Sequence, residues 1–281
     1  MMQLGIMART FVRPTLPQTL DALVAHGLHT TQFSLECAGL SSMPDHLDLA
    51  TISAIRQEFA ERRLTMAAVS GTYNMIHPDP IMRQDGLQRL RVLAAACEPL
   101  GTALITLCTG TRDPHNMWRR HPDNDAPAAW HDLLLAMQQA VAIAETYHVT
   151  LAFEPEPANV VDRPSKGRRL LDELRSPNLK VVMDGANLFH VGDLARMPEV
   201  LDEAFALLGQ DVALAHAKDL AQDGEAGHIA AGKGKLDYDR YLSLLHQVGY
   251  NGALILHSLD ESEVASSVAF LRAKLARVPQ H

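Results

Sequence analysis

Four side chains able to bind a metal ion or move a proton each close a short apolar run of the sequence. Glu154 ends the run TLAFE and Asp184 ends LKVVMD, while His216 and His257 close VALAH and ALILH. The steps between consecutive members are 30, 32 and 41 residues, each about the length of one strand-helix unit. Two carboxylates and two imidazoles suit zinc, manganese, cobalt or iron better than calcium. We therefore expect these four side chains to bind one divalent metal ion.

The alternation of side chains along a strand predicts where these four groups point. Residues two apart share one face of a strand, so Ala152 accompanies Glu154 and Val182 accompanies Asp184. If those faces line the inside of a barrel, the polar groups meet at one rim. A carboxylate at a buried strand end needs a compensating charge, which a bound cation would supply. For any one residue the alternative is a strand end that faces solvent, but four in register favour a shared site.

Eight apolar runs alternate with segments of helical periodicity and define the predicted architecture. The runs are QLGIM, TTQFSL, LTMAAVS, ALITLC, TLAFE, LKVVMD, VALAHAK and ALILH, and the helical segments include residues 48–63, 86–100, 128–147 and 238–248. Gly27 and Gly249 follow helical segments as typical C-terminal stops. Because parallel strands need helical crossovers that cover the sheet, we predict an α/β fold, a (β/α)8 TIM barrel, as one domain over residues 1–281. An open doubly wound sheet is the alternative, but no GxGxxG follows the first run.

Composition narrows the class of protein. The 281 residues are 47% hydrophobic and 21% charged, which is ordinary for a globular protein, and the net charge of -8 argues against a nucleic-acid partner. The N-terminus lacks a secretory leader and no run approaches about 18 apolar residues, so neither secretion nor a membrane is expected. Cys37, Cys97 and Cys108 are widely separated and are predicted to be buried thiols of a cytoplasmic protein. A homo-oligomer is expected only because soluble enzymes often form one.

Two charged residues beside the predicted ligands are candidates for catalysis. Lys218 has the strand parity of His216 and could hold a substrate oxygen or stabilise an enolate, although lysines at strand ends are usually solvated. Glu156 follows Pro155 and points the same way as Glu154 if the chain stays extended, which would place its carboxylate near the metal. The alternative is that Glu156 is exposed at the surface.

Other polar residues near strand ends are candidates for contacts with a substrate. Asn187 could bind a sugar hydroxyl, although capping a turn is the commoner role of asparagine. The remaining candidates follow the third and fourth predicted strands and are Tyr73, His77, Arg112 and, more weakly, His115. The longest irregular segment, residues 108–130, contains two tryptophans, and an active-site lid, an oligomer contact and a solvated insertion all fit it.

The motifs FEPEP, MDGANLFH, HAKD, GKGKLDY and GYNGALIL occur in an order that resembles the xylose-isomerase-like TIM-barrel family of sugar-phosphate isomerases and epimerases. The resemblance covers nearly the whole chain, and VSGTYNMIHPDP also resembles the third-strand segment of one branch of the family. It implies that Glu154, Asp184 and His216 are the metal ligands of strands five to seven. It also implies that Lys218 and Asp219 are the strand-seven Lys-Asp pair, which places Asp219 among the candidate substrate contacts.

One position departs from the family pattern. Epimerase-type members carry a glutamate at the end of strand eight, where it is a ligand and the second acid/base, and this sequence has His257 there. Metal binding is still expected, but inversion at carbon needs a group on each face of the substrate. Aldose-ketose isomerisation can use one base, so the sequence favours a metal-dependent isomerase that abstracts a proton through a metal-bound enediolate, with Glu154 as a ligand and as the possible catalytic base.

Several other functions start from the same barrel. Epimerisation and dehydration of a keto-polyol share the enolate chemistry, with Glu156 or His257 as the second group. A phosphodiesterase like the endonuclease IV relatives would need more ligands and a basic surface, and Asn187 stands where those relatives have a histidine. A non-catalytic carbohydrate-binding barrel is the remaining alternative. In each enzymatic case except the phosphodiesterase, the partner is a small carbohydrate, either a free sugar, a sugar acid or a sugar phosphate.

Overall fold

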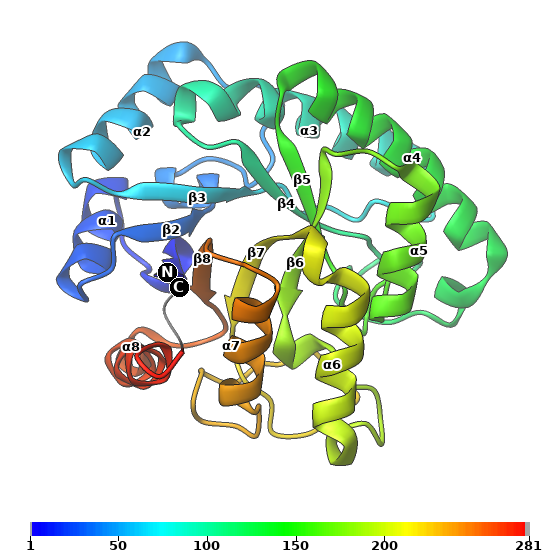
Figure 1. Ribbon diagram of the computed structural model, residues 1–281. Coiled ribbons are helices and arrows are strands. Elements are labelled where there is room, and N and C mark those ends of the chain that lie inside the picture. The colour runs from blue at the N-terminus through cyan, green and yellow to red at the C-terminus, as the bar shows by residue number, and fades with distance from the viewer. Residues whose placement is uncertain (1, 279–281) are drawn as a thin grey trace.

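A closed barrel of eight parallel strands forms the centre of the computed structural model, which describes residues 2–278 (Figure 1). The strands are β1 (Gln3–Met7), β2 (Thr30–Phe33), β3 (Thr65–Ser70), β4 (Leu104–Cys108), β5 (Thr150–Glu154), β6 (Leu179–Asp184), β7 (Val212–Ala217) and β8 (Ala253–Leu256). Neighbours in the barrel follow the order of the chain, and β8 pairs with β1 to close it. The predicted (β/α)8 barrel is therefore confirmed, and the open sheet is excluded.

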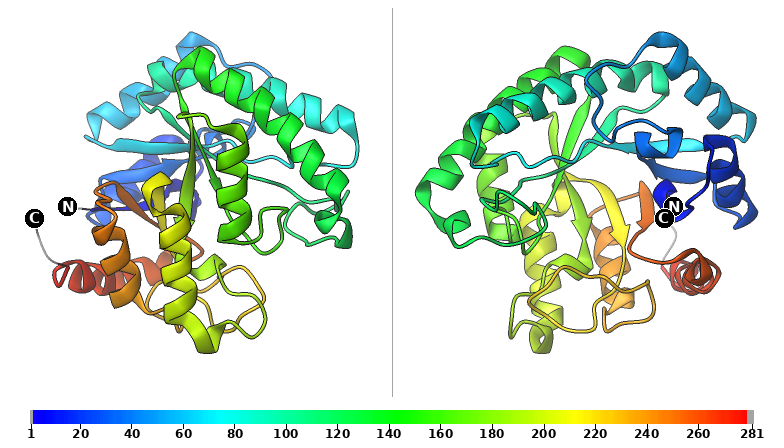
Figure 2. Two further views of the ribbon diagram at one scale, coloured as in Figure 1. Left: turned by 45° about the vertical axis from the view of Figure 1, so that its right-hand side comes forward. Right: turned by 180° about the vertical axis from the view of Figure 1, so that it is seen from behind.

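Eight helices surround the strands, as the three views in Figures 1 and 2 show. They are α1 (Leu16–Ala25), α2 (Leu49–Glu61), α3 (Pro80–Leu100), α4 (Pro127–Tyr147), α5 (Pro164–Leu174), α6 (Met197–Leu208), α7 (Tyr238–Gln247) and α8 (Glu261–Leu275). Within residues 2–278, no helix is both long enough and apolar enough to cross a bilayer.

Local sequence signals explain where the helices begin and end. The side chain of Asp48 caps α2 by accepting a hydrogen bond from the backbone of Thr51. The predicted start of α3 at residue 86 is wrong, because Asp79 caps an earlier turn and Pro80 supplies a first residue whose φ already suits a helix. Gly27 and Gly249 adopt positive φ angles of 68° and 77°, which confirms the predicted stops after α1 and α7.

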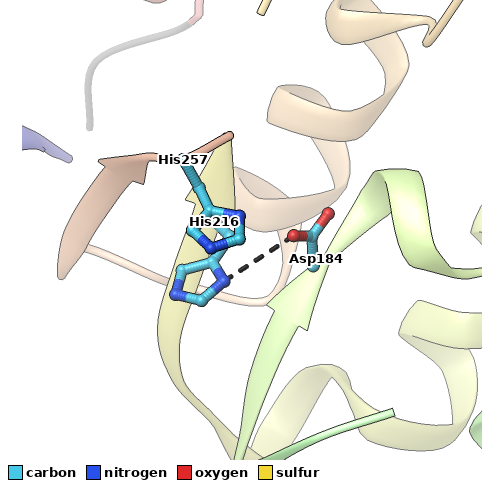
Figure 3. Close-up of side chains that lie close together, drawn as sticks. All are labelled: Asp184, His216 and His257. Carbon is cyan, nitrogen blue, oxygen red and sulfur yellow. Dashed lines mark ion pairs between the residues drawn. The ribbon is translucent and has the colours of Figure 1, made fainter. Parts of the chain in front are cut away.

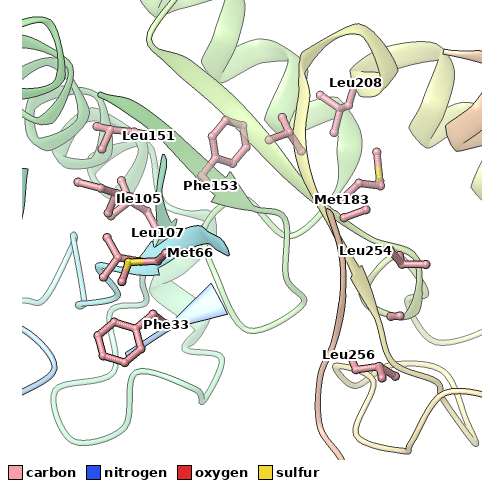
Figure 4. Packing of buried hydrophobic residues seen from close by; sticks show 14 of the residues in the cluster. Phe33, Met66, Ile105, Leu107, Leu151, Phe153, Met183, Leu208, Leu254 and Leu256 are labelled. Carbon is pink, nitrogen blue, oxygen red and sulfur yellow. The ribbon is translucent and has the colours of Figure 1, made fainter. Parts of the chain in front are cut away.

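The apolar side chains of the strands pack into two layers, one outside the barrel and one inside it. The larger layer lies between the strands and the helices, where Phe33, Leu151, Phe153 and Met183 pack (Figure 4). The smaller layer fills the inside of the barrel, and its buried members are Met7, Ala68, Ala152, Val182, Leu214, Ala253 and Ile255. The predicted companions Ala152 and Val182 belong to this inner layer, as do Leu214 and Ile255, which stand two residues before His216 and His257. Their alternation therefore directs the polar side chains to the mouth of the barrel.

The cysteines follow their prediction with one exception. Cys97 and Cys108 are buried free thiols, but Cys37 is only half-buried. It lies in the short helix η2 (Leu35–Ala38), in the connection after β2 and outside the packed strand.

Candidate metal centre

A cavity of about 610 Å³ opens at the carboxyl ends of the strands. Its walls include Arg9, Gln32 and Trp118 together with five of the predicted site residues, of which four are Glu154, Glu156, His216 and Lys218. His257 also lines it, at the end of β8. This is the end of a (β/α)8 barrel at which enzymes of this fold place their active sites.

Asp184, His216 and His257 form a cluster of ligand-type atoms that could hold a metal ion (Figure 3). One atom from each residue lies within 4.8 Å of the other two. Asp184 Oδ2 and His216 Nδ1 are buried and find no hydrogen-bond partner among the described residues. Their nearest polar neighbours are ion-pair contacts, with Lys218 Nζ 3.3 Å from Asp184 Oδ2 and Glu154 Oε2 3.4 Å from His216 Nδ1, so neither atom is engaged in a hydrogen bond and both could face a cation. The donor set of carboxylate and imidazole fits a first-row transition metal ion.

Glu154 stands beside this cluster and is held by the loop after β6. Its Oε2 lies 3.4 Å from His216 Nδ1, and its Oε1 accepts a hydrogen bond of 2.6 Å from Asn187 Nδ2. Asn187 also accepts from the backbone of Gly227. Both ends of this buried amide are therefore engaged, so Asn187 holds Glu154 in place, and its contact with a substrate stays a prediction.

Lys218 is a buried cation between the two carboxylates. Its Nζ lies 3.3 Å from Asp184 Oδ2 and 3.9 Å from Glu154 Oε1. Burial alone would disfavour the charged forms, but the pairing outweighs it: the pKa of Asp184 is lowered and the pKa of Lys218 is raised. Burial also opposes the charge on His216, yet Glu154 and Asp184 raise the pKa of His216 to about 9. A cation bound at Nδ1 must therefore displace a proton.

Glu156 provides a second carboxyl group within the cavity wall. It is only 8% exposed, and its backbone N–H donates to the carbonyl of Val161, which folds the chain after Pro155 inward. Burial and the charge of Glu154 raise the pKa of Glu156 to about 7. At neutral pH this group can therefore both hold and release a proton.

His257 reaches the cluster but differs from His216 in its hydrogen bonds. The two imidazole rings are stacked, with centroids 5.2 Å apart and planes inclined by 11°. Arg9 Nη2 lies 3.3 Å from His257 Nε2, and Ser258 Oγ lies 2.9 Å from Nδ1. A guanidinium only donates, so Nε2 accepts and Nδ1 carries the proton. Burial and then the charge of Lys218 hold the pKa of His257 well below its usual value.

Asp219 is not placed in the cavity. Its carboxylate accepts hydrogen bonds from the backbone N–H groups of Leu220, Gly232 and Leu236, and its backbone pairs with Ile229. The side chain therefore organises the loop that connects β7 to α7. All this bonding turns the carboxylate toward its own loop, and the predicted contact with a substrate stays a prediction.

The candidates after β3 and β4 also lie away from the cavity, because the chain there turns outward to α3 and α4. The Tyr73 ring packs on Gly86 of α3, and Arg112 binds Asp132 of α4 at 2.6 Å. The His77 ring contacts the carbonyl of Pro114, and His115 hydrogen-bonds through its backbone to Asp113. The structure therefore does not bring these four candidates, Tyr73, His77, Arg112 and His115, to the site.

The irregular segment after β4 contributes to the cavity wall. Met117 and Trp118 line the cavity, and Trp118 is 52% exposed. Arg120 Nη1 binds the buried Asp162 at 2.9 Å, and Asn124 Nδ2 donates to the carbonyl of Ala158. These contacts anchor the segment to the connection between β5 and α5.

Of the three cavity residues Arg9, Gln32 and Trp118, which the sequence analysis does not name, one can be recognised from a sequence pattern. Gln32 interrupts the apolar run TTQFSL at a position that points into the barrel, where its side chain contacts His216. Arg9 and Trp118 lie in connections after β1 and β4, and no periodicity marks them.

Comparisons with known proteins agree on the fold. Residues 20–274 match the family model described as xylose isomerase-like TIM barrel. No curated protein matches the sequence. Among solved structures, a D-tagatose 3-epimerase-like protein superposes with a TM-score of 0.77 at 15% identity over 99% of this chain and 98% of its own. The IolI protein with a bound zinc atom gives 0.74 at 16% over 100% of both chains. The probable 3-DHS dehydratase AsbF from Bacillus anthracis gives 0.73 at 12% over 97% and 99%.

Proposed function

Because the chain belongs to the xylose isomerase-like TIM barrel family, we propose that it is a divalent-metal-dependent sugar isomerase. The observation that carries this proposal is the cluster of Asp184, His216 and His257, in which the buried atoms Asp184 Oδ2 and His216 Nδ1 form no hydrogen bond, beside Glu154 in the barrel mouth. The relatives described above include sugar-processing proteins, which supports a small carbohydrate as the substrate. A cytoplasmic location and a homo-oligomeric state remain predictions from the sequence.

The cation would be held by Asp184 Oδ2 and His216 Nδ1, with Glu154 and His257 completing the predicted ligand set. When bound, a zinc, manganese, cobalt or iron ion would supply Lewis-acid polarisation of the hydroxyl and carbonyl oxygens of a sugar. The IolI structure, which has the same fold, carries a zinc atom, and this supports a metal ion in the present chain.

The protein groups around that position can move a proton between neighbouring carbons. Glu154 takes the proton from the carbon beside the carbonyl and returns it to the former carbonyl carbon, while Asn187 holds its Oε1 in place. The hydroxyl proton passes between the two substrate oxygens, so no co-reactant is needed. Lys218 Nζ stabilises the oxygen that gains negative charge.

Epimerisation is the second candidate, and one observation favours it. Inversion needs an acid on the opposite face, and the buried Glu156 with a pKa of about 7 is suited to that step. We place isomerisation first because His257 replaces the strand-eight glutamate that the sequence resemblance implies for epimerases. Dehydration of a keto-polyol would begin with the same proton removal.

A substrate screen with defined products tests the proposal. Metal-free protein is loaded with zinc, manganese or cobalt and incubated with aldoses, ketoses and sugar acids, and products are identified by NMR. An aldose-ketose pair, with Glu156→Gln retaining at least about a tenth of the turnover, is the expected result. An inverted centre, lost in Glu156→Gln, would establish the epimerase instead. Binding of sugars without any turnover would identify a non-catalytic barrel.

A further inference from the structure

A buried chain of neutral polar groups crosses the barrel to the ring of His216. Gln32 on β2 is only 3% exposed, and its Oε1 lies 2.8 Å from His216 Nε2. Its Nε2 donates to Ser70 Oγ on β3 and to Thr106 Oγ1 on β4, both at 3.0 Å. Both polar atoms of the Gln32 side chain therefore have partners. These partners, Ser70, Thr106 and His216, lie on three different strands.

The direction of these hydrogen bonds determines which nitrogen of His216 carries a proton. The amide oxygen of Gln32 can only accept, so His216 Nε2 must be the N–H that donates to it. The lone pair or second proton then belongs to Nδ1, which faces Glu154 and Asp184 at 3.4 and 3.6 Å. If the Gln32 amide were rotated, its NH2 group would face His216, and His216 Nε2 would have to accept a hydrogen bond and carry no proton. The proton of the ring would then lie on Nδ1, which could not bind a cation.

We propose that Gln32 is a positioning residue that holds His216 with its proton on Nε2 and presents Nδ1 to a divalent cation. The inference rests on the proposed metal site and assigns a role to a residue outside the ligand set. Ligand histidines commonly depend on such partners, and loss of the partner lowers metal affinity about 10- to 100-fold. A neutral amide performs this task without adding another negative charge beside Glu154 and Asp184.

Two variants of Gln32 separate positioning from simple filling of space. Gln32→Met keeps the length of the side chain but cannot accept the hydrogen bond, whereas Gln32→Glu keeps an acceptor at the same place. Zinc affinity is measured by competition with a chromogenic chelator, with Gln139→Met on the outer face of α4 as the control. We expect about a 10- to 100-fold loss for Gln32→Met, while the control stays within about threefold of the native protein. Gln32→Glu keeps the acceptor and adds a negative charge, so it should bind zinc at least as tightly as the native protein.

The tautomer itself gives a readout that needs no variant. In zinc-loaded native protein labelled with 15N-histidine, we expect His216 to show zinc on Nδ1 and a protected N–H at Nε2. Zinc on Nε2 would overturn the proposal even if Gln32→Met failed to fold. In a folded Gln32→Met protein, the Nε2 proton should exchange faster than in the native protein, and unchanged exchange would also contradict the role.

Asp184→Ala distinguishes failure of this inference from failure of the metal site. If Asp184→Ala loses zinc while Gln32→Met binds it as tightly as the native protein does, only the positioning role is wrong. If Asp184→Ala binds zinc with native affinity, the proposed metal site is wrong and the role of Gln32 is overturned with it.

Discussion

The two halves of the barrel mouth contribute different kinds of polar group. β5 to β8 bring ionisable side chains to the cavity region, namely Glu154, Asp184, His216 and His257. β2 to β4 bring Gln32, Ser70 and Thr106, which carry no charge, and β1 ends with the apolar Met7. Among the strand residues, one half thus holds the ionisable groups and the other half supplies neutral hydrogen-bond partners, while the charged Arg9 and Glu36 lie in the connections after β1 and β2.

This difference has a physical reason. Charges that lie within about 4 Å of one another in a buried site change each other's pKa strongly, as Lys218 and Asp184 do here. A charged residue in place of Gln32 would add to that coupling, whereas an amide contacts His216 without changing the charge of the site. The comparison predicts that variants of the charged half have the larger effects on function.

The largest effect is expected from Asp184→Ala. Removal of a ligand oxygen from the centre of the cluster should lower metal affinity by more than about 100-fold, beyond the effect typical of supporting residues. Activity should fall to background with it. Metal content by elemental analysis and turnover measure both, and Asp239→Ala on α7 is the matched surface control. Native activity in Asp184→Ala would refute the metal-dependent mechanism.

Lys218→Met should separate metal binding from turnover. The variant removes a positive charge that lies 3.3 Å from Asp184 Oδ2, so the cation should bind at least as tightly as before. Turnover should fall about 100- to 1,000-fold, because a donor to the developing negative charge is lost. Chelator competition and steady-state kinetics test the two halves of this prediction, with the exposed Lys233→Met as control. A loss of metal equal to the loss of turnover would mean that Lys218 only maintains the site.

Glu156→Gln should change how stability depends on pH in the metal-free protein. The folded pKa is about 7 and the usual value is 4.5, so between these pH values the folded chain holds a proton that the unfolded chain has released. Unfolding free energy therefore falls as pH rises from about 5 to 7 and stays low above that. At pH 8, Glu156→Gln should be more stable than the native protein by roughly 1 to 3 kcal/mol. Urea unfolding at pH 5 and pH 8 measures the difference, and an equal shift at both pH values would contradict the raised pKa.

His257→Ala should have a smaller effect on the metal than Asp184→Ala. Both ring nitrogens of His257 already have partners in Arg9 and Ser258, unlike His216 Nδ1. We expect metal affinity to fall by less than about tenfold, within the range of a supporting residue. Chelator competition with both alanine variants in parallel gives the ratio. Equal losses would make His257 a full ligand.

Sequence reasoning located the charged half of the mouth and largely missed the neutral half. Glu154 and Asp184 can be predicted because each ends an apolar run and lies on the same face of its strand as a residue that points into the barrel. The alternation of side chains that shows this can be seen within a single strand. Gln32 matters through His216, which lies on the opposite side of the barrel, and no local pattern reports a contact over that sequence separation. Asp219 shows a second limit of sequence patterns, because its motif follows the predicted ligand His216 and gives no sign that the carboxylate binds its own loop.

The smallest effect is expected from Thr106→Val. Thr106 contacts Gln32 and does not contact His216 directly, so the variant tests the neutral half at one step from the proposed ligand. The variant removes one of the two hydroxyls that accept from Gln32 Nε2, while Ser70 still holds the amide. Because Gln32 Oε1 keeps its contact with His216, metal affinity should fall only a few-fold, less than the 10- to 100-fold loss typical when a direct partner is removed. Chelator competition on Thr106→Val, Ser70→Ala and the double variant measures the trend. The double variant should approach Gln32→Met, because an amide without acceptors is free to rotate and the Nε2 proton of His216 is then no longer fixed.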